Sequence, residues 1–522
     1  MARCCRPPQR GVLGAGKALP FVRRRSPGAC ILIAATIREI ELVVQRYIEF
    51  GKTSGEEEAA EAPHLIADGY FNDGFLEPFL TRKKWLVLAR KGAGKSMLGE
   101  KIKQLSTAST ENIAASLTHL ADFPFKTFAQ VMPGSSESAT RYPASWSWLL
   151  CLQIIDALHS HPGETRSLNI DANAGIAQLK TLGLLPTSDL QRLVVRSAKS
   201  GFKAQIPKLL EYFSENTSAN TPADLAFLNL VASLKELIGR YHFHGQQFLI
   251  IDGLDDILTK EAIQYETLSA LIFETARLNA YFKKLNISVW IIVLCRTDIY
   301  EVLPGANKNK IRQDSCVEID WYPMSGVVEQ SKLLELANLR AKLSLGKDID
   351  IFEEYFPKHM GSGIPVRNFL ADLTRHTPRD FLALLTQIQN FTKGEFALKA
   401  EVIDGTKAYS EKYFLPEIKD ELVGYVTPKE LQIFLNCVGE IHERAFTVAR
   451  ISAVAKVHGL PKDKLDVLLH ALFSASAIGT TWRDPKSRQN KFEFKFRNPN
   501  SAFNPRRTVV LHKGLWKALN IS

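Results

Sequence analysis

Short apolar runs alternate with longer segments of helical periodicity along most of the chain. Four apolar residues stand together at 85–88 (WLVL), four at 248–251 (FLII) and seven at 289–295 (VWIIVLC). Runs of this length, bounded by polar residues, are typical of strands buried on both faces of a parallel sheet. The segment ASLTHLADFPFKTF at 115–128 is predicted to hold one more strand. The pattern predicts an α/β fold with a parallel sheet.

The same pattern divides the chain into further parts. Residues 36–50 have the spacing of an amphipathic helix, and an acidic stretch without that spacing follows over 51–63. Helical periodicity dominates 136–240 and returns after 326. The predicted organisation is a basic disordered tail or mis-started extension at 1–38, a helix and acidic linker at 39–63, an α/β core at 64–325 with a helical insertion at 136–240, a helical lid at 326–410, and a winged helix at 411–522.

The winged-helix prediction rests on the order of elements near the end of the sequence. Three amphipathic helices are predicted at 427–438, 448–459 and 461–475. Two alternating segments, AIGTTW at 477–482 and KFEFKFRN at 491–498, are predicted to pair as a hairpin around a polar turn. Three helices followed by a hairpin are the elements of a winged helix.

Charge is concentrated at the two ends of the chain, although the net charge of the 522 residues is +11. Residues 1–38 contain eight Lys or Arg and no acid, whereas residues 479–517 contain ten Lys or Arg and two acids. The remainder is slightly acidic. A basic hairpin with interleaved aromatic residues favours contact with a DNA backbone, although alternate aromatic residues are also what a buried hairpin face requires.

Composition excludes several classes of protein. The seven cysteines form no C-x-x-C pair, which argues against a disulfide framework or a zinc site. The longest candidate for a membrane segment, ACILIAAT at 29–36, is too short to cross a bilayer. We therefore expect a cytoplasmic protein without a membrane partner.

Two segments resemble a phosphate-binding loop, G-x-x-x-x-G-K-[ST]. The first, GVLGAGKA at 11–18, follows no strand and ends in Ala18, so we take it as a chance match. The second, ARKGAGKS at 89–96, follows the apolar run at 85–88 and precedes apolar residues at helical spacing. In such loops backbone N–H groups wrap the phosphates at a helix N-terminus.

The second segment is therefore predicted to bind a nucleotide. Alanine replaces the first glycine, a change we expect to be tolerated because that residue closes the strand. The lysine would contact the outer phosphates, and the Ser96 hydroxyl would bind Mg²⁺. The predicted nucleotide-binding residues are Ala89, Arg90, Lys91, Gly92, Ala93, Gly94, Lys95, Ser96 and Met97.

The acidic end of another apolar run supplies the second part of the predicted site. Asp252 follows the run at 248–251 and is predicted to join Ser96 in the Mg²⁺ shell. The next residue is Gly253, so the catalytic base would have to be Asp255 or Asp256. The alternative is that these two acids form only a solvated turn. Slow hydrolysis is therefore expected.

Two arginines are predicted to contact the γ-phosphate. Arg296 follows the apolar run at 289–295, with Thr297 as second choice, and the alternative is a surface ion pair with Asp298. Arg379 lies in HTPRD, where Thr followed by Pro, with Asp three positions on, is typical of a helix start. It would reach a phosphate if this helix folds over the site, and the alternative is an exposed arginine on a capped helix.

These motifs together carry a family resemblance. ARKGAGKS, FLIIDGLDD, VLCRTDIY, HTPRDFLALL and the ending LHKGLWKALNI resemble a family of prokaryotic P-loop ATPases related to the STAND and AAA+ groups, which include origin-recognition ATPases. The resemblance runs from about residue 64 to the end and is weak over 136–240. It implies ATP as the nucleotide, ATP-driven switching or assembly, and a genomic context that is often phage defence. Gly253 departs from the acid that most relatives carry.

Three functions follow from this sequence. The first is an ATP-dependent switch in which ATP closes the lid through Arg379, with nucleotide-dependent self-assembly and a protein partner. The second is a DNA-binding ATPase of the origin-recognition or repair type. The third is a non-hydrolysing adaptor in which the nucleotide is structural, and Gly253 favours it most.

Overall fold

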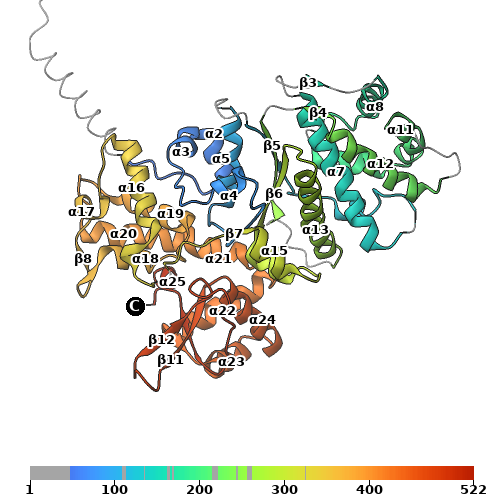
Figure 1. Ribbon diagram of the computed structural model, residues 1–522. Helices are drawn as coiled ribbons and strands as arrows, with labels where there is room; N and C mark the ends of the chain where they lie inside the picture. The colour runs from blue at the N-terminus through green and yellow to red at the C-terminus, as the bar shows by residue number, and fades with distance from the viewer. Residues whose placement is uncertain are drawn as a thin grey trace, which may run out of the picture. The chain divides into compact units, whose positions relative to one another are not determined.

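The computed structural model describes residues 47–107, 113–134, 136–160, 165–166, 170–187, 189–213, 221–242, 245–254, 262–323 and 325–521 (Figure 1). The chain divides into two compact units, Met1–Tyr47 and Ile48–Ser522, and the elements given below belong to the second. The predicted basic tail at 1–38 lies outside the described residues.

A five-stranded parallel sheet forms the centre of the core. Its strand order is β2-β5-β6-β1-β7, and every neighbouring pair runs parallel. The carboxyl ends of all five strands therefore lie at one edge, where ligands collect in open α/β sheets. This sheet confirms the predicted α/β class. The strands are β1 (Leu86–Ala89), β2 (Ile113–His119), β5 (Gln246–Asp252), β6 (Val289–Arg296) and β7 (Cys316–Ile319).

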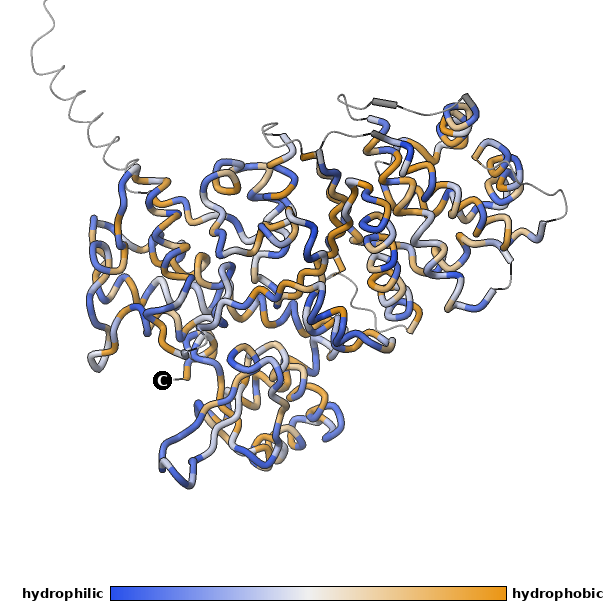
Figure 2. Tube along the Cα trace, viewed as in Figure 1, coloured by the Kyte–Doolittle hydropathy of each residue, from blue (hydrophilic) through white to orange (hydrophobic). Residues whose placement is uncertain are grey.

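The inner strands are buried because helices cover both faces of the sheet. All four residues of β1 and seven of the eight in β6 are buried, as their unbroken apolar runs predict. Figure 2 shows this part of the chain as predominantly hydrophobic. The helices of the core are α2 (Gly55–Glu61), α3 (Pro63–Ala67), α4 (Glu77–Leu80), α5 (Lys95–Thr107), α6 (Phe125–Phe128), α13 (Ala262–Lys284), α14 (Thr297–Val302) and α15 (Lys308–Ser315).

The acidic segment that the sequence assigned to a linker forms helix α2 instead. The Ser54 side chain caps it by accepting hydrogen bonds from two backbone N–H groups of the first turn. Glu58 is buried and its Oε1 lies 2.7 Å from Nη2 of Arg340. An acidic segment resembles a solvated linker in the sequence, because its ion-pair partner is not visible there. The partner of Glu58 is Arg340, which is distant in the sequence. The linker prediction is therefore wrong for this stretch.

The helix predicted over 36–50 does not include residues 47–50. Residues 36–46 lie outside the described part, and residues 47–50 have no helical structure. The backbone N–H of Ile48 donates to Oε1 of Gln389, and the Gln389 amide donates back to the Ile48 carbonyl, both at 3.0 Å. These side-chain bonds take the place of helical backbone bonds.

The predicted insertion is helical and packs on the sheet through its longest helix. α7 contacts both α12 and α13 (Figure 1), and its residues 144–155 are all buried. A short antiparallel pair joins the segment after α7, at β3 (Thr165–Arg166), to the end of the insertion, at β4 (Tyr241–His242). The helices are α7 (Ser138–Ser160), α8 (Ile170–Thr181), α9 (Leu190–Ala198), α10 (Ser200–Lys203), α11 (Ile206–Phe213) and α12 (Ala223–Ile238).

The lid is helical, but its predicted end at residue 410 falls inside a continuous helical run. α20, a π-helical turn at Ser410–Phe414 and α21 follow one another without a break, although Pro416 cannot donate a backbone hydrogen bond within the run. The lid elements are η2 (Val328–Gln330), α16 (Lys332–Leu345), α17 (Ile351–Glu354), β8 (His359–Met360), β9 (Ile364–Pro365), α18 (Val366–Ala371), α19 (Pro378–Phe391), α20 (Lys399–Tyr409) and α21 (Leu415–Glu421).

The C-terminal part has the three helices and the hairpin of a winged helix. Its antiparallel sheet has the order β10-β13-β11-β12, of which the sequence predicted only the hairpin β11-β12. The elements are α22 (Pro428–Ile441), β10 (Ala445–Phe446), α23 (Val448–Val457), α24 (Lys462–Ser474), β11 (Ile478–Arg483), β12 (Asn490–Glu493), β13 (Thr508–Leu511) and α25 (Lys513–Trp516).

The strand predicted over 491–498 is too long. β12 ends at Glu493, and the chain then turns inward so that Phe494 and Phe496 are buried. The backbone N–H of Phe496 donates to the Ser476 hydroxyl at 3.1 Å rather than to a strand partner. The alternate aromatic residues extend beyond the end of β12 because the Phe496 ring packs against His376 and Tyr322.

Among the described residues no helix combines the length and the apolar character needed to span a bilayer.

Candidate nucleotide-binding site

The loop at 89–96 lies between a buried strand and a helix, at the carboxyl edge of the sheet. Ala89 is the last residue of β1, and Lys95 is the first of α5. Gly92 and Gly94 have φ values of +77° and +94°, which side-chain-bearing residues rarely adopt. A Cβ at Gly92 would also come within 3.1 Å of Cβ of Arg379. The glycines are therefore required by the loop conformation and by the helix packed on it.

A cavity of 370 Å³ opens over this loop. Its volume lies within the range of small-molecule sites. Of the nine predicted nucleotide-binding residues, the seven from Lys91 to Met97 line it, and Ala89 and Arg90 do not. Asp252, buried at the end of β5, lines the same cavity, so the structure brings Ser96 and Asp252 together as predicted. The Arg90 guanidinium turns away and donates to the Arg375 carbonyl at 3.1 Å.

The residue after Asp252 has no room for a side chain. Gly253 has a φ of +81°, and a Cβ there would lie 2.9 Å from the backbone nitrogen of Leu120. The turn is held closed because the Leu120 N–H donates to the Asp252 carbonyl at 2.8 Å. An acid at this position is therefore incompatible with the observed backbone. Asp255 and Asp256, the predicted bases, lie outside the described residues.

The structure pairs Arg296 with Asp298, the alternative that the sequence left open. Nη2 of Arg296 lies 2.7 Å from Oδ2 of Asp298, and Nε lies 3.0 Å from Oδ1. Burial opposes ionisation of this carboxyl, but Arg296 and, more weakly, Lys95 hold the pKa of Asp298 below its usual value. Arg296 does not line the cavity, although its strand lies between β1 and β5.

The first turn of α19 lies directly on the phosphate loop. Thr377 caps the helix by accepting from the Asp380 N–H at 3.3 Å, and Pro378 is its first residue, as the sequence predicted. The backbone N–H of Arg379 donates to the Gly92 carbonyl at 3.3 Å. Arg379 also lines the cavity, so the lid helix does fold over the site.

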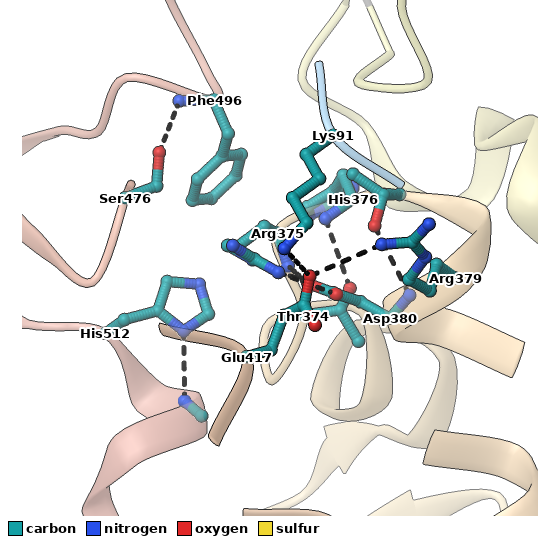
Figure 3. A network of polar contacts seen from close by, with 12 residues as sticks. Lys91, Thr374, Arg375, His376, Arg379, Asp380, Glu417, Ser476, Phe496 and His512 are labelled. Atoms are coloured by element: carbon teal, nitrogen blue, oxygen red, sulfur yellow. Dashed lines mark hydrogen bonds and ion pairs between the residues drawn. The ribbon is translucent and has the colours of Figure 1, made fainter. Parts of the chain in front are cut away.

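One glutamate of the lid holds two cations of the site. Oε1 of Glu417 lies 3.0 Å from Nζ of Lys91 and 3.4 Å from Nη1 of Arg379 (Figure 3). Lys91 belongs to the phosphate loop, whereas Arg379 and Glu417 belong to α19 and α21. Glu417 therefore links the loop to the lid. A phosphate that binds Arg379 would have to compete with the Glu417 carboxylate for it.

Arg375, just before the cap of α19, is the centre of a buried ion-pair network. Its guanidinium makes two bonds to Asp380, at 2.8 and 2.9 Å, and one to Glu421 at 2.6 Å. The Tyr413 hydroxyl donates to the same Asp380 carboxylate at 3.0 Å. Burial would raise the pKa of Asp380, but the bonds from Arg375 outweigh it and lower this pKa to about 2. The network fixes the start of α19 and thereby the position of Arg379.

The sequence missed an apolar compartment and a helix at the cavity. Aromatic and aliphatic side chains line part of the cavity, and the Trp321 indole donates to the Ala93 carbonyl of the phosphate loop at 2.9 Å. Helix α2 and His119 also line it. Only α2 had a signal in the sequence, since a serine followed by acids is a typical helix start. The apolar residues are Tyr70, Phe71, Phe75, Ile319, Trp321, Leu336 and Leu382.

Two buried histidines lie where the lid meets the winged helix. The ring of His376 stacks on Phe496, with centroids 5.4 Å apart, and Phe496 contacts the ring of His512 (Figure 3). Burial lowers the pKa of each histidine from 6.5 to about 3. The positive charge of Arg497 lowers the pKa of His376 further, and that of Arg375 lowers the pKa of His512. Both imidazoles are therefore neutral in the folded protein.

Acidification is expected to destabilise this junction. Because the folded pKa values are depressed, the unfolded chain binds protons first, so stability is present above pH 6.5 and is lost as the pH falls toward 3. Two such groups give a slope of about 2.7 kcal/mol per pH unit. Urea midpoints between pH 7 and pH 4.5 test this. His376→Gln and His512→Gln should each remove about half of this contribution, and the double variant should remove nearly all of it. A slope in the double variant equal to that of the wild type would contradict the assignment.

Comparison with known proteins adds little to this site. No family model and no curated protein match the chain. Among solved structures it is similar to the Orc1 protein of Aeropyrum pernix in complex with DNA, at 11% identity and a TM-score of 0.37, over 89% of this chain and 92% of that one. It is also similar to Cdc6p of Pyrobaculum aerophilum, at 12% identity and a TM-score of 0.29, over 90% and 97%. Similarity this weak supports no argument, so the class defined here, an α/β protein with a phosphate loop, rests on the chain's own geometry.

Proposed function

We propose that this chain binds ATP with Mg²⁺ in the 370 Å³ cavity, hydrolyses it slowly and uses the bound nucleotide as a switch. One observation supports the proposal above the others. The phosphate loop, Asp252 from β5 and Arg379 from the lid line a single cavity, although they are far apart in sequence.

The residues at the cavity fit a triphosphate and a magnesium ion. The backbone N–H groups at the start of the 13-residue helix α5 would bind phosphate oxygens, with Lys95 reaching the outer ones. The Ser96 hydroxyl and the Asp252 carboxylate are hard oxygen ligands of the kind Mg²⁺ requires. When bound, the ion would neutralise charge that develops on the phosphate oxygens. The apolar compartment around Trp321 would enclose the base by stacking and burial.

The ion pairs of Glu417 suggest how binding would be transmitted. In the present arrangement Glu417 holds both Arg379 and Lys91. A γ-phosphate near Lys95 would compete for Arg379, because phosphate carries more charge than a carboxylate. Release of Glu417 would loosen α21, which leads into the winged helix. A protein partner or a second copy of the chain would then sense the nucleotide through this part.

Tryptophan fluorescence tests binding, because Trp321 bonds to the phosphate loop. Titration of ATP with Mg²⁺ into the full chain should change the emission and saturate, and the Trp321→Phe variant should lose the change while calorimetry still detects ATP. Release of phosphate, measured in parallel, separates the switch from the non-hydrolysing adaptor that the geometry of Gly253 favours. Saturating binding without phosphate release would support the adaptor, and absence of binding at millimolar ATP would contradict both.

DNA binding through the winged helix is a second candidate function. Five cations of the hairpin region are exposed, whereas Arg507 is held by Glu493 at 2.5 Å and lies over the Trp482 ring at 3.6 Å. Phe494 and Phe496 are buried and are therefore not available to bases, whereas Phe492 is exposed on the hairpin. The exposed cations favour contact with the DNA backbone. The exposed cations are Arg483, Lys486, Arg488, Lys491 and Arg506.

The salt dependence of binding tests this candidate. If Arg483, Lys486 and Arg488 each neutralise one phosphate, replacing all three with alanine should lower the slope of log K against log salt by about 2.7. Fluorescence anisotropy with a labelled duplex measures the slope. Replacing the exposed residues Lys283, Lys284 and Lys399, which lie outside the winged helix, gives a matched loss of charge. Most of the slope should remain in this variant. Equal losses in both triple variants would contradict a specific role for the hairpin.

A further inference from the structure

The cavity contains an acid that could replace the base missing after Asp252. Gly253 cannot carry a side chain without moving Leu120, so β5 itself supplies no acid at that position. Among the residues that the structure describes, a group that activates water must therefore come from another element. Helix α2 and the end of β2 both reach the cavity beside Asp252.

Helix α2 is held against the phosphate loop at its first residue. A Cβ on Gly55 would lie 3.1 Å from the Met97 backbone nitrogen and 3.3 Å from Cβ of Ser96, so a larger residue would have to push the two elements apart by a few tenths of an ångström. The buried pair between Glu58 and Arg340 fixes the helix from its other side. The next residue, Glu56, is thereby placed at the rim of the cavity, next to the predicted Mg²⁺ ligands.

Glu56 meets His119 in this position. Oε1 of Glu56 lies 3.2 Å from Nδ1 of His119, the last residue of β2. His119 is the register partner of Asp252 on the neighbouring strand, so its position is set by the sheet. Donor atoms of Glu56, His119 and Asp252 all lie within 4.8 Å of one another. A carboxylate oriented by an imidazole therefore faces the end of the cavity that contains Asp252.

We propose that Glu56 is the catalytic base of this ATPase and that His119 is its positioning residue. The inference rests on the proposed function. A water between Glu56 and the γ-phosphate would attack phosphorus as the bond to the β–γ bridging oxygen breaks. The water proton passes to the Glu56 carboxylate and then to solvent, and ADP and phosphate leave. His119 holds the carboxylate in place through its bond to Oε1, which leaves Oε2 to accept the proton.

The test compares ATP affinity with turnover in the full chain. Glu56→Gln should keep the dissociation constant for ATP with Mg²⁺ within about threefold while lowering kcat by about 10²–10⁴. Glu57→Gln, at the adjacent exposed position outside the cavity, is the matched control and should hydrolyse as the wild type does. Loss of ATP binding in Glu56→Gln would instead indicate a metal ligand or a structural role and would overturn the assignment.

His119→Asn and the double variant separate positioning from structure. If His119 acts through Glu56, His119→Asn should lower kcat with little change in KM, and adding it to Glu56→Gln should cause no further loss. Independent, multiplying losses would overturn the positioning role. If the wild type hydrolyses ATP and Glu56→Gln has the same kcat, this inference alone is overturned. A wild-type chain that binds ATP without turnover would overturn it too, and only a chain that fails to bind ATP would also overturn the proposed nucleotide site.

Discussion

Lys95→Ala is expected to abolish ATP turnover and to weaken ATP binding by about 100-fold or more, since a lysine that bonds two phosphates contributes about 3 kcal/mol or more. Lys95 is the first residue of α5, is buried and lines the cavity, so no neighbouring cation on the same helix can take its place. Calorimetric titration and phosphate release measure the two effects. The change should leave the fold intact, which circular dichroism checks.

Lys103→Ala is the matched control on the same helix. Lys103 is half exposed, pairs with Glu100 at 3.2 Å and does not line the cavity. Removing it also deletes one positive charge from α5, yet ATP affinity should change by no more than about twofold. Equal weakening by both changes would mean that the general charge of α5, rather than contact at the loop, determines binding.

Arg375→Met is expected to destabilise the lid by about 3–5 kcal/mol. The substitution keeps much of the side-chain volume but leaves Asp380, which is fully buried, without the guanidinium that neutralises it. Glu421 loses its partner as well. A lower urea midpoint, together with weaker ATP binding through displacement of Arg379, is the expected result.

Arg367→Met is the control for this effect. Arg367 also forms two ion pairs, with Asp350 at 2.6 Å and Glu353 at 3.0 Å, but its side chain is 26% exposed and both partners are more exposed than that. Exposed pairs contribute about 0–1 kcal/mol, so its loss should be small. A cost for Arg375→Met as small as that for Arg367→Met would show that Asp380 is not held by the network.

Parts of this molecule that depend on local pattern could be predicted from the sequence. The strands β1, β5 and β6 are unbroken apolar runs, and a strand, two glycines and a Lys–Ser pair locate the phosphate loop. The start of α19 was predictable for the same reason, because a threonine cap and a proline at the first position specify a helix end within five residues.

Parts that depend on distant partners could not be predicted. The acids of α2 indicate a solvated linker until the buried Arg340 is placed beside Glu58. Arg296 at a strand end is equally suited to a phosphate or to Asp298, and only the side-chain geometry distinguishes them. Gly253 departs from the acid that the family resemblance predicts, and the sequence alone shows this. The reason is that the backbone nitrogen of Leu120 lies 2.9 Å from the Cβ position of residue 253, which depends on the packing of two strands.

The most direct test of the central claim is calorimetric titration of ATP into the full chain, with and without Mg²⁺, followed by phosphate release from the same sample. The geometry predicts one ATP per chain, tighter binding when Mg²⁺ is present because Ser96 and Asp252 supply its ligands, and slow release of phosphate. Absence of saturable ATP binding in the presence of Mg²⁺ would contradict the assignment of this cavity as a nucleotide site.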